Sequence, residues 1–185
     1  MHSVELLPDP VTERAVVEVW RRLRAAGLPS QAAHRHPTNR PHLTLGTAAT
    51  LPPETRDGLR RALAVLPLPL RLDGTVRFTG RTRVLAWRVR PDDALLRLQE
   101  TVWRTLRGTA SDPDGPPNPL LAPDRWAPHV TLGRGRGAAW PDSDEVLHDA
   151  LFRDSAAPDG VLAGRWTAAR AYDSADRTTE RVDGV

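Results

Sequence analysis

The sequence contains no cysteine and no lysine among its 185 residues, so all 26 basic residues are arginine. The absence of cysteine excludes thiol nucleophiles, disulfide bonds, thiolate zinc sites and iron–sulfur clusters. The absence of lysine excludes Schiff-base and pyridoxal chemistry, the lysine of a phosphate-binding P-loop and the lysyl-nucleotide intermediate of ATP-dependent ligases. Any catalysis must therefore come from His, Asp, Glu, Ser, Thr, Tyr or Arg.

Long apolar runs are also missing. No segment approaches the roughly 18 apolar residues of a membrane span. The start of the chain has the acidic Glu5 where a signal peptide has its apolar core. We therefore expect a cytoplasmic protein without membrane contact. Its length is that of one compact domain or of two small lobes that share a core.

Charge is unevenly distributed along the chain. Residues 1–110 hold 18 arginines and 10 acidic residues, a net charge of +8, whereas residues 111–185 hold 8 arginines and 13 acidic residues, a net charge of −5. A basic first half suits a phosphate-bearing ligand. A solvated arginine-rich face explains the same distribution.

Hydrophobic periodicity and turn residues predict a mixture of strands and helices. The predicted strands span residues 4–7, 41–46, 68–78, 83–90, 126–133 and 166–172. The predicted helices span residues 10–26, 54–66, 93–107 and 143–152. A loop rich in Pro, Gly and Asp is expected at residues 111–123, between the two halves of the chain. This succession favours an α+β fold over a helical bundle.

One short segment occurs twice. Residues 41–46 read Pro-His-Leu-Thr-Leu-Gly and residues 128–133 read Pro-His-Val-Thr-Leu-Gly, and the two histidines, His42 and His129, lie 87 residues apart. Coincidence is roughly a one-in-a-thousand explanation of this agreement. On a strand, each segment places its His and Thr on one face and its apolar residues on the other.

The polar residues of this repeat indicate a function. Packing alone would preserve the apolar positions and leave the His and Thr positions free to vary. Two similar half-sheets related by an approximate two-fold axis would bring both imidazoles and both hydroxyls to one cleft. Two imidazoles in one cleft make a general acid–base pair.

On these two His-x-Thr motifs the chain resembles the two-histidine (2H) phosphoesterase superfamily, and most closely its bacterial branch of 2′-5′ RNA ligases or RNA 2′,3′-cyclic phosphodiesterases. The likeness extends to residues 4–8, 78–89 and 171–174, which resemble the first strand, the middle hairpin and the closing strand of that family. It implies a single two-lobed domain over residues 1–185. Antiparallel sheets would face a central cleft, with the helices outside.

The resemblance also implies an activity and roles for four residues. The activity is that of a hydrolase without metal or other cofactor, which opens the 2′,3′-cyclic phosphate of an RNA end or a small nucleotide to a 2′-phosphate. The same site run backwards would join RNA in a 2′-5′ linkage. His42 would be the proton donor and His129 the proton acceptor, although the near symmetry of the two motifs leaves the reverse assignment open. Thr44 and Thr131 would donate hydrogen bonds to the non-bridging phosphate oxygens.

Three further residues are candidates for substrate binding. Arg134, just beyond the second motif, would contact the phosphate, unless it is an ordinary surface arginine. Trp126 and Tyr172 would stack on a nucleobase, and core packing is the competing explanation for both. His34 and His36 lie in a polar loop that is either a lid or an ordinary connection.

Two other functions remain open at this point. A non-catalytic nucleotide- or RNA-binding module would use the same groove, but the retention of both histidines and both threonines argues against it. A metal site is disfavoured because neither motif contains an Asp or Glu to complete the coordination sphere. We expect a monomer whose partner is RNA or a nucleotide with a cyclic phosphate.

Overall fold

The computed structural model describes residues 1–108 and 118–182. Its strands are β1 (His2–Pro8), β2 (Leu43–Ala48), β3 (Leu68–Phe78), β4 (Arg83–Val89), β5 (His129–Gly135), β6 (Val161–Asp173) and β7 (Thr178–Arg181). Its α-helices are α1 (Pro10–Ala25), α2 (Pro53–Leu63), α3 (Asp93–Arg107) and α4 (Asp144–Phe152), and its short 3-10 helices are η1 (Gln31–Ala33) and η2 (Pro119–Leu121). None of the described helices has the length and apolarity needed to cross a lipid bilayer.

The predicted α+β class is confirmed, and the corrections concern the boundaries of elements. Both motif strands begin later than predicted, at Leu43 and at His129, since the prolines before the histidines lack the N–H that a strand ladder needs. Helix α2 ends at Leu63 rather than at residue 66, ahead of Pro67. Within the predicted loop at 111–123, residues 111–117 lie outside the described part of the chain, and η2 forms a turn near its end.

The last two strands were the least predictable. Strand β6 begins five residues before the predicted start, at Val161, and β7 was not predicted at all. All four residues of β7 are exposed, so the strand has no apolar alternation from which it could be inferred. It is recognised only by its antiparallel pairing with β6.

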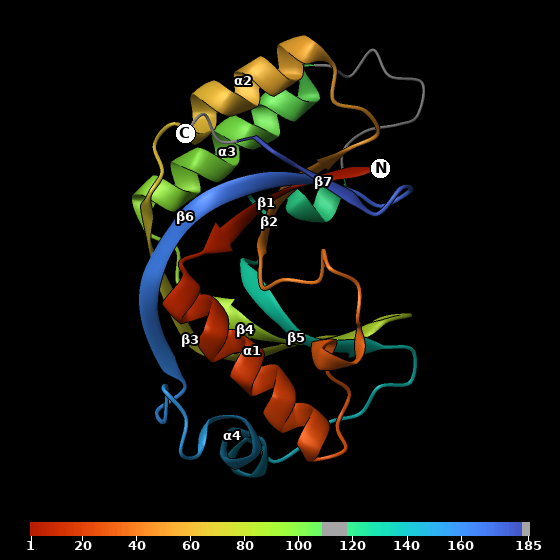
Figure 1. The fold of residues 1–185 in the computed structure, drawn as a ribbon, viewed down its shortest axis with the longest axis vertical. Helices are drawn as coiled ribbons and strands as arrows, with labels where there is room; N and C mark the ends of the chain where they lie inside the picture. The colour runs from red at the N-terminus through yellow and green to blue at the C-terminus, as the bar shows by residue number, and fades with distance from the viewer. Residues whose placement is uncertain (109–117, 183–185) are drawn as a thin grey trace.

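The seven strands form one antiparallel sheet in the order β2-β1-β6-β3-β4-β5, with β7 paired to β6. Strand β6 is long enough to serve both halves: residues 161–166 pair with β3 and residues 166–173 pair with β1. Figure 1 shows β6 as a long blue arc along one side of the molecule. The end strands β2 and β5 contact each other, so the sheet curls back on itself.

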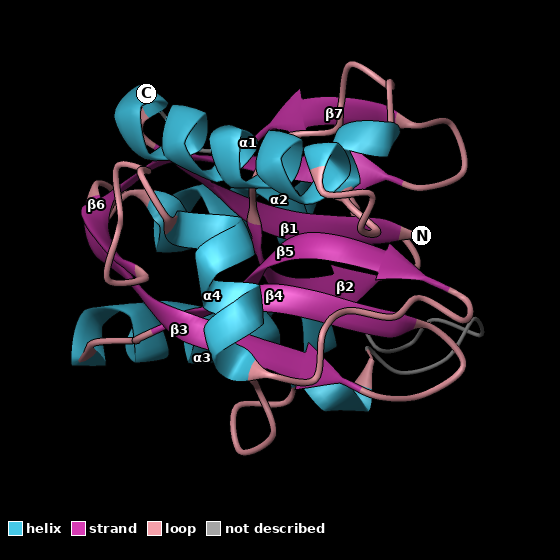
Figure 2. Cartoon of the chain, turned by 90° about the horizontal axis from the view of Figure 1, so that it is seen from below, coloured by secondary structure: helices cyan, strands magenta, loops and turns pink. Residues whose placement is uncertain are grey.

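This order has an internal two-fold symmetry. If β1, β2 and β3 are exchanged with β4, β5 and β6, the new strand order is the original order read from the opposite edge of the sheet. The helices follow the same symmetry. Helix α1 packs on α4, β5 and β6, and α3 packs on the corresponding elements α2, β2 and β3. Figure 1 places α1 with α4 at one end and α2 with α3 at the other, and the helices lie around the outside of the strands in Figure 2. The chain is therefore a duplication in which each half contributes a strand to the other.

The register of the motif strands repeats as well. In both halves the motif strand pairs antiparallel with its neighbour, and one leucine, Leu45 or Leu132, has no partner in the register because of a β-bulge. The corresponding pairs are Leu6–Leu43 and Trp87–Val130, Glu5–Thr44 and Ala86–Thr131, and Val4–Gly46 and Leu85–Gly133. Bulges of this kind re-aim the side chains next to them. The duplication thus preserved the direction of the two His-x-Thr faces.

The apolar face of each motif strand lies in the core, as predicted. Leu43, Leu45, Val130 and Leu132 are each no more than 1% exposed. Helix α1 covers this core with a buried stripe at helical spacing, and its first turn is capped by Asp9. Oδ2 of Asp9 also accepts a hydrogen bond of 2.8 Å from the backbone N–H of Arg165 in β6. The start of α1 is thereby tied to the central strand of the sheet.

Candidate active site

The two motif histidines have the same local geometry. Nδ1 of His42 lies 2.7 Å from the carbonyl oxygen of Arg40, and Nδ1 of His129 lies 2.7 Å from the carbonyl oxygen of Ala127. A carbonyl oxygen only accepts, so Nδ1 carries a proton and donates in both rings. Nε2 is then an acceptor in the neutral ring and a donor in the protonated ring. Each imidazole therefore offers Nε2 as the atom that can exchange a proton.

The structure brings the two motifs together. The indole N–H of Trp126, three residues before His129, donates a hydrogen bond of 3.0 Å to the carbonyl oxygen of Thr44. Trp20 of α1 donates an equivalent bond of 3.0 Å to the carbonyl oxygen of Thr131. Each motif strand is thus held by a tryptophan: Trp126 bonds to β2 and Trp20 bonds to β5.

The surroundings of His129 change its pKa. Burial lowers the pKa of His129 below its ordinary value of 6.5, and the nearby charge of His42 lowers the pKa further. The hydrogen bond from Nδ1 to the Ala127 carbonyl opposes this shift without cancelling it. The Phe78 ring, whose centroid lies 4.6 Å from that of His129, accounts for part of the burial. The His129 imidazole is consequently neutral near pH 7.

His42 has a different neighbour, the buried carboxylate of Glu5. Oε1 of Glu5 lies 3.7 Å from Nε2 of His42, and Glu5 is only 3% exposed. Ser3 Oγ donates a hydrogen bond of 2.6 Å to Oε1, and Arg170 Nε donates one of 2.8 Å to Oε2. Sequence reasoning missed both Glu5 and Arg170. The available signal was an acidic residue in the apolar opening strand and a basic residue in the apolar closing strand.

The threonines lie on the same face as the histidines. Thr44 is paired in register with Glu5, and Thr131 with Ala86. Both side chains are partly exposed. Within the described part of the chain, neither hydroxyl bonds to another protein group. Both can therefore donate to a bound anion.

The three predicted substrate-binding residues have different surroundings. Arg134 is exposed on β5 and pairs with Val84, which places it on the same face as Thr131. Tyr172 on β6 pairs with Ser3, which places it on the face of Glu5. Trp126 is partly buried, packs against the core and bonds to Thr44. Arg134 and Tyr172 thus share the polar face, whereas Trp126 supports it from the side.

Three further histidines, His2, His34 and His36, lie outside the two motifs in the sequence. His34 and His36 are exposed in a loop in which the Asn39 amide donates to the carbonyl oxygens of Gln31 and His34, at 2.9 Å each. His2 is partly buried, and its Nε2 lies 3.6 Å from Oδ2 of Asp173. Among the residues that the structure describes, no group of three or more His, Asp or Glu side chains is arranged to hold a metal ion.

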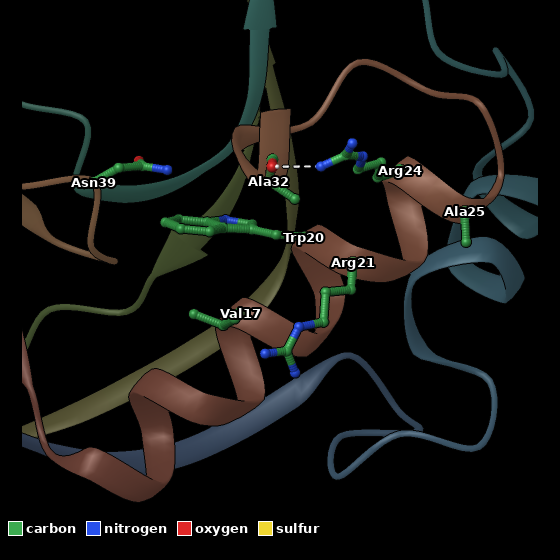
Figure 3. Close-up of a pocket in the computed structure, with 7 residues that line it drawn as sticks. All are labelled: Val17, Trp20, Arg21, Arg24, Ala25, Ala32 and Asn39. Atoms are coloured by element: carbon green, nitrogen blue, oxygen red, sulfur yellow. Dashed lines mark hydrogen bonds between the residues drawn. The ribbon is translucent and has the colours of Figure 1, made fainter. Parts of the chain in front are cut away.

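Two cavities of about 590 and 520 Å³ lie on the helices α1 and α3 rather than at the motifs. They are related by the internal symmetry, since both are lined by a Trp-Arg pair and a further Arg one turn on. The corresponding residues are Trp20, Arg21 and Arg24 in the first cavity (Figure 3) and Trp103, Arg104 and Arg107 in the second. The segments 19–24 and 102–107 both read Val-Trp-Arg-x-Leu-Arg, a second repeat that the sequence analysis missed.

Comparison with known proteins gives a consistent result. The sequence profile of the 2′-5′ RNA ligase superfamily matches residues 7–170. No curated protein matches the chain at a significant level.

Several solved structures share the fold. TT0787 of Thermus thermophilus is 19% identical with a TM-score of 0.60, over 98% of this chain and 94% of that one. A structure described as a phosphoesterase is 18% identical with a TM-score of 0.56, over 97% and 92%. LigT of E. coli complexed with NADP+ is 17% identical with a TM-score of 0.56, over 97% and 91%. At these identities the likeness demonstrates a common fold.

Proposed function

Because the chain belongs to the 2′-5′ RNA ligase superfamily, we propose that it is a metal-independent phosphodiesterase that hydrolyses 2′,3′-cyclic phosphates on RNA ends or small nucleotides. The observation that carries the proposal is the pair of motif histidines. Their Nδ1 atoms are fixed by identical carbonyl contacts, while a carboxylate lies near Nε2 of His42 and a phenyl ring packs against His129. Action on RNA or nucleotides as a cytoplasmic monomer stays a prediction.

The proposed reaction needs one base and one acid. His129, neutral near pH 7, takes a proton from water as the water oxygen attacks phosphorus. The bond from phosphorus to the ribose O3′ breaks, and protonated His42 gives its proton to O3′. The products are a 2′-phosphate and a 3′-hydroxyl, with atoms and charges balanced. Each positioned proton transfer typically contributes about 10²- to 10⁴-fold to the rate.

Charge that develops on the non-bridging oxygens needs donors. Thr44 and Thr131, whose hydroxyls are not engaged by other described groups, would donate one hydrogen bond each. Arg134, on the same face, would add a charged donor. Donors placed before the reaction stabilise the five-coordinate phosphorus more than the substrate.

The same geometry supports ligation, in which the ring opens in the same direction but to a different nucleophile. If an RNA 5′-hydroxyl replaces water as the nucleophile, His129 takes its proton and the cyclic phosphate opens to a 2′-5′ linkage. No ATP is consumed, because the energy comes from the strained ring. Ligation is therefore an expected minor activity when RNA ends are abundant.

A turnover assay tests the proposal. The purified protein is incubated with 2′,3′-cyclic AMP and with an oligonucleotide that ends in a cyclic phosphate, each with and without EDTA. We expect a 2′-phosphate product, insensitivity to EDTA, and a rate loss of at least about 10²-fold in His42→Ala and in His129→Ala. His36→Ala, an exposed histidine of the 31–40 loop, serves as the matched control and should retain the wild-type rate.

The alternatives give different results in the same assay. Binding of the oligonucleotide without turnover would indicate a non-catalytic binding module. Turnover that EDTA abolishes would indicate a metal-dependent enzyme. Either result would overturn the proposal.

A further inference from the structure

We infer that Glu5, held by Arg170 and Ser3, is a positioning residue that makes His42 rather than His129 the proton donor. The inference is based on a difference between the two halves of the duplicated fold. Its kinetic part rests on the proposed function, whereas its electrostatic part does not.

The internal two-fold axis identifies which residues correspond around the two histidines. The pairs in register on the histidine face are Glu5 with Arg170 and Ser3 with Tyr172 in the first half, and Ala86 with Val76 and Val84 with Phe78 in the second half. All four positions near His42 are polar, and all four corresponding positions near His129 are apolar. The backbone is thus repeated, but the side chains around the two imidazoles have opposite character.

The polar half stabilises a positive charge on His42. The carboxylate of Glu5 is buried and held by two donors, so it cannot turn away from the imidazole. Its Oε1 lies 3.7 Å from Nε2, within the range of an ion pair with a protonated imidazole. This distance is too long for a hydrogen bond, so the proton on Nε2 remains available for transfer.

Other charged groups near His42 do not replace Glu5 in this role. Arg170 on β6 bonds to the far oxygen of Glu5, so the near oxygen faces the imidazole. The side chain of Arg40 is turned to Glu13, with hydrogen bonds of 2.8 and 2.6 Å. His129 and Arg134 on β5, Tyr172 on β6 and Arg181 of β7, which pairs in register with Arg170, also lie on this face, and none of them carries a carboxylate. Glu5 is therefore the described carboxylate that acts on His42.

The apolar half has the opposite effect on His129. Its position opposite Glu5 is taken by Ala86, and Phe78 packs against the imidazole. Loss of water disfavours a charged ring in such surroundings. One duplicated scaffold thus yields an acid in one half and a base in the other.

The main test replaces the polar pair near His42 with the apolar pair that lies at the corresponding positions near His129. The double variant Glu5→Ala/Arg170→Val copies the pair Ala86 and Val76, and it leaves no buried charge without a partner. Glu5→Gln, which keeps an acceptor for Ser3 and Arg170 but removes the negative charge, is the second variant. Glu13→Gln removes a carboxylate from a nearby ion pair that does not face His42 and is the matched control.

The first measurement is an NMR titration of the His42 imidazole, which requires no enzymatic activity and is assigned with His42→Ala. We expect the double variant and Glu5→Gln to lose the charge of this ring at a lower pH than the wild type, since both remove a negative charge that lies 3.7 Å from Nε2. Glu13→Gln should titrate as the wild type does. An unchanged titration in both test variants would overturn the inference, whatever the enzyme does.

The second measurement is the pH dependence of kcat/KM. The alkaline limb reports the group that must be protonated, so it should move to lower pH in both test variants while the acidic limb stays in place. A uniform loss of rate with both limbs unchanged would show that Glu5 has only a structural role. If the wild type has no turnover, the proposed function fails but the NMR result still decides the electrostatic part.

Discussion

At the scale of residues, two histidines with the same local sequence acquire different chemistry from their neighbours. Nδ1 of each is bonded to the carbonyl oxygen two residues before it. The difference arises from the other neighbours of each ring: a buried carboxylate lies near Nε2 of His42, and Phe78 packs against the ring of His129. In the proposed mechanism these surroundings separate the acid from the base, a recurrent way in which proteins divide two like groups between two roles.

The lowered pKa of His129 predicts the acidic limb of the activity profile. A general base must be neutral, and a pKa below 6.5 keeps His129 neutral to a lower pH than a free imidazole. We expect kcat/KM for 2′,3′-cyclic AMP to fall only below pH 6.5 on the acidic side, within a bell-shaped profile. A midpoint above pH 6.5, or a rate that keeps rising with pH through neutrality, would contradict the assignment.

At the scale of elements, the glycine at the end of each repeated segment, Gly46 or Gly133, is explained by packing. A Cβ on Gly133 would lie 2.2 Å from the carbonyl oxygen of Pro29, and one on Gly46 would lie 2.6 Å from Cδ1 of Leu106. Neither glycine has a left-handed backbone, so the constraint is space and not conformation. The repeated glycines therefore let the segments that cover β2 and β5 approach closely.

The two glycines should differ in their tolerance of alanine. In Gly133→Ala the backbone at Pro29 must move, whereas in Gly46→Ala the end of a leucine side chain can yield. We expect Gly133→Ala to lower the free energy of unfolding by about 1 to 3 kcal/mol, and Gly46→Ala by less, as measured by urea denaturation.

Gly108→Ala is the control for this pair. A Cβ there would lie 3.6 Å from its nearest atoms, an ordinary contact, and the backbone is helical. Its stability should equal or slightly exceed that of the wild type, since alanine favours this conformation over glycine. Equal effects of all three substitutions would show that close packing is not the reason for the repeated glycine.

At the scale of the whole molecule, the two lobes are joined by the sheet itself. Strand β6 pairs with β1 along one part and with β3 along the other, and each half of the chain supplies a helix that covers the other half. Such an exchange leaves neither half able to complete its own core. Residues 1–185 are accordingly expected to act as a single two-lobed domain.

Cooperative unfolding tests this expectation. Because β6 crosses between the lobes, loss of one lobe exposes the core of the other, and both should unfold in one transition. We expect the far-ultraviolet circular dichroism and tryptophan fluorescence transitions in urea to coincide. Two separated transitions would show that the lobes fold independently.

Much of the fold was accessible from the sequence because its signals are local. The helical stripe of α1, the Asp9 cap and the alternation of the motif strands all lie within a few residues of one another. The strand β7 and the start of β6 were not accessible, because they are specified by pairing with distant strands rather than by their own apolar pattern. The Val-Trp-Arg-x-Leu-Arg repeat was present in the sequence but was not recognised.

The sequence by itself determined that two His-x-Thr strands are repeated and that their polar residues share a face, because side-chain alternation is a property of the strand alone. Only the tertiary structure decided how the two histidines differ. Glu5 and Arg170 stand 165 positions apart and meet across β1 and β6. Charge and burial at a site depend on every element that packs there, and no local pattern contains that information.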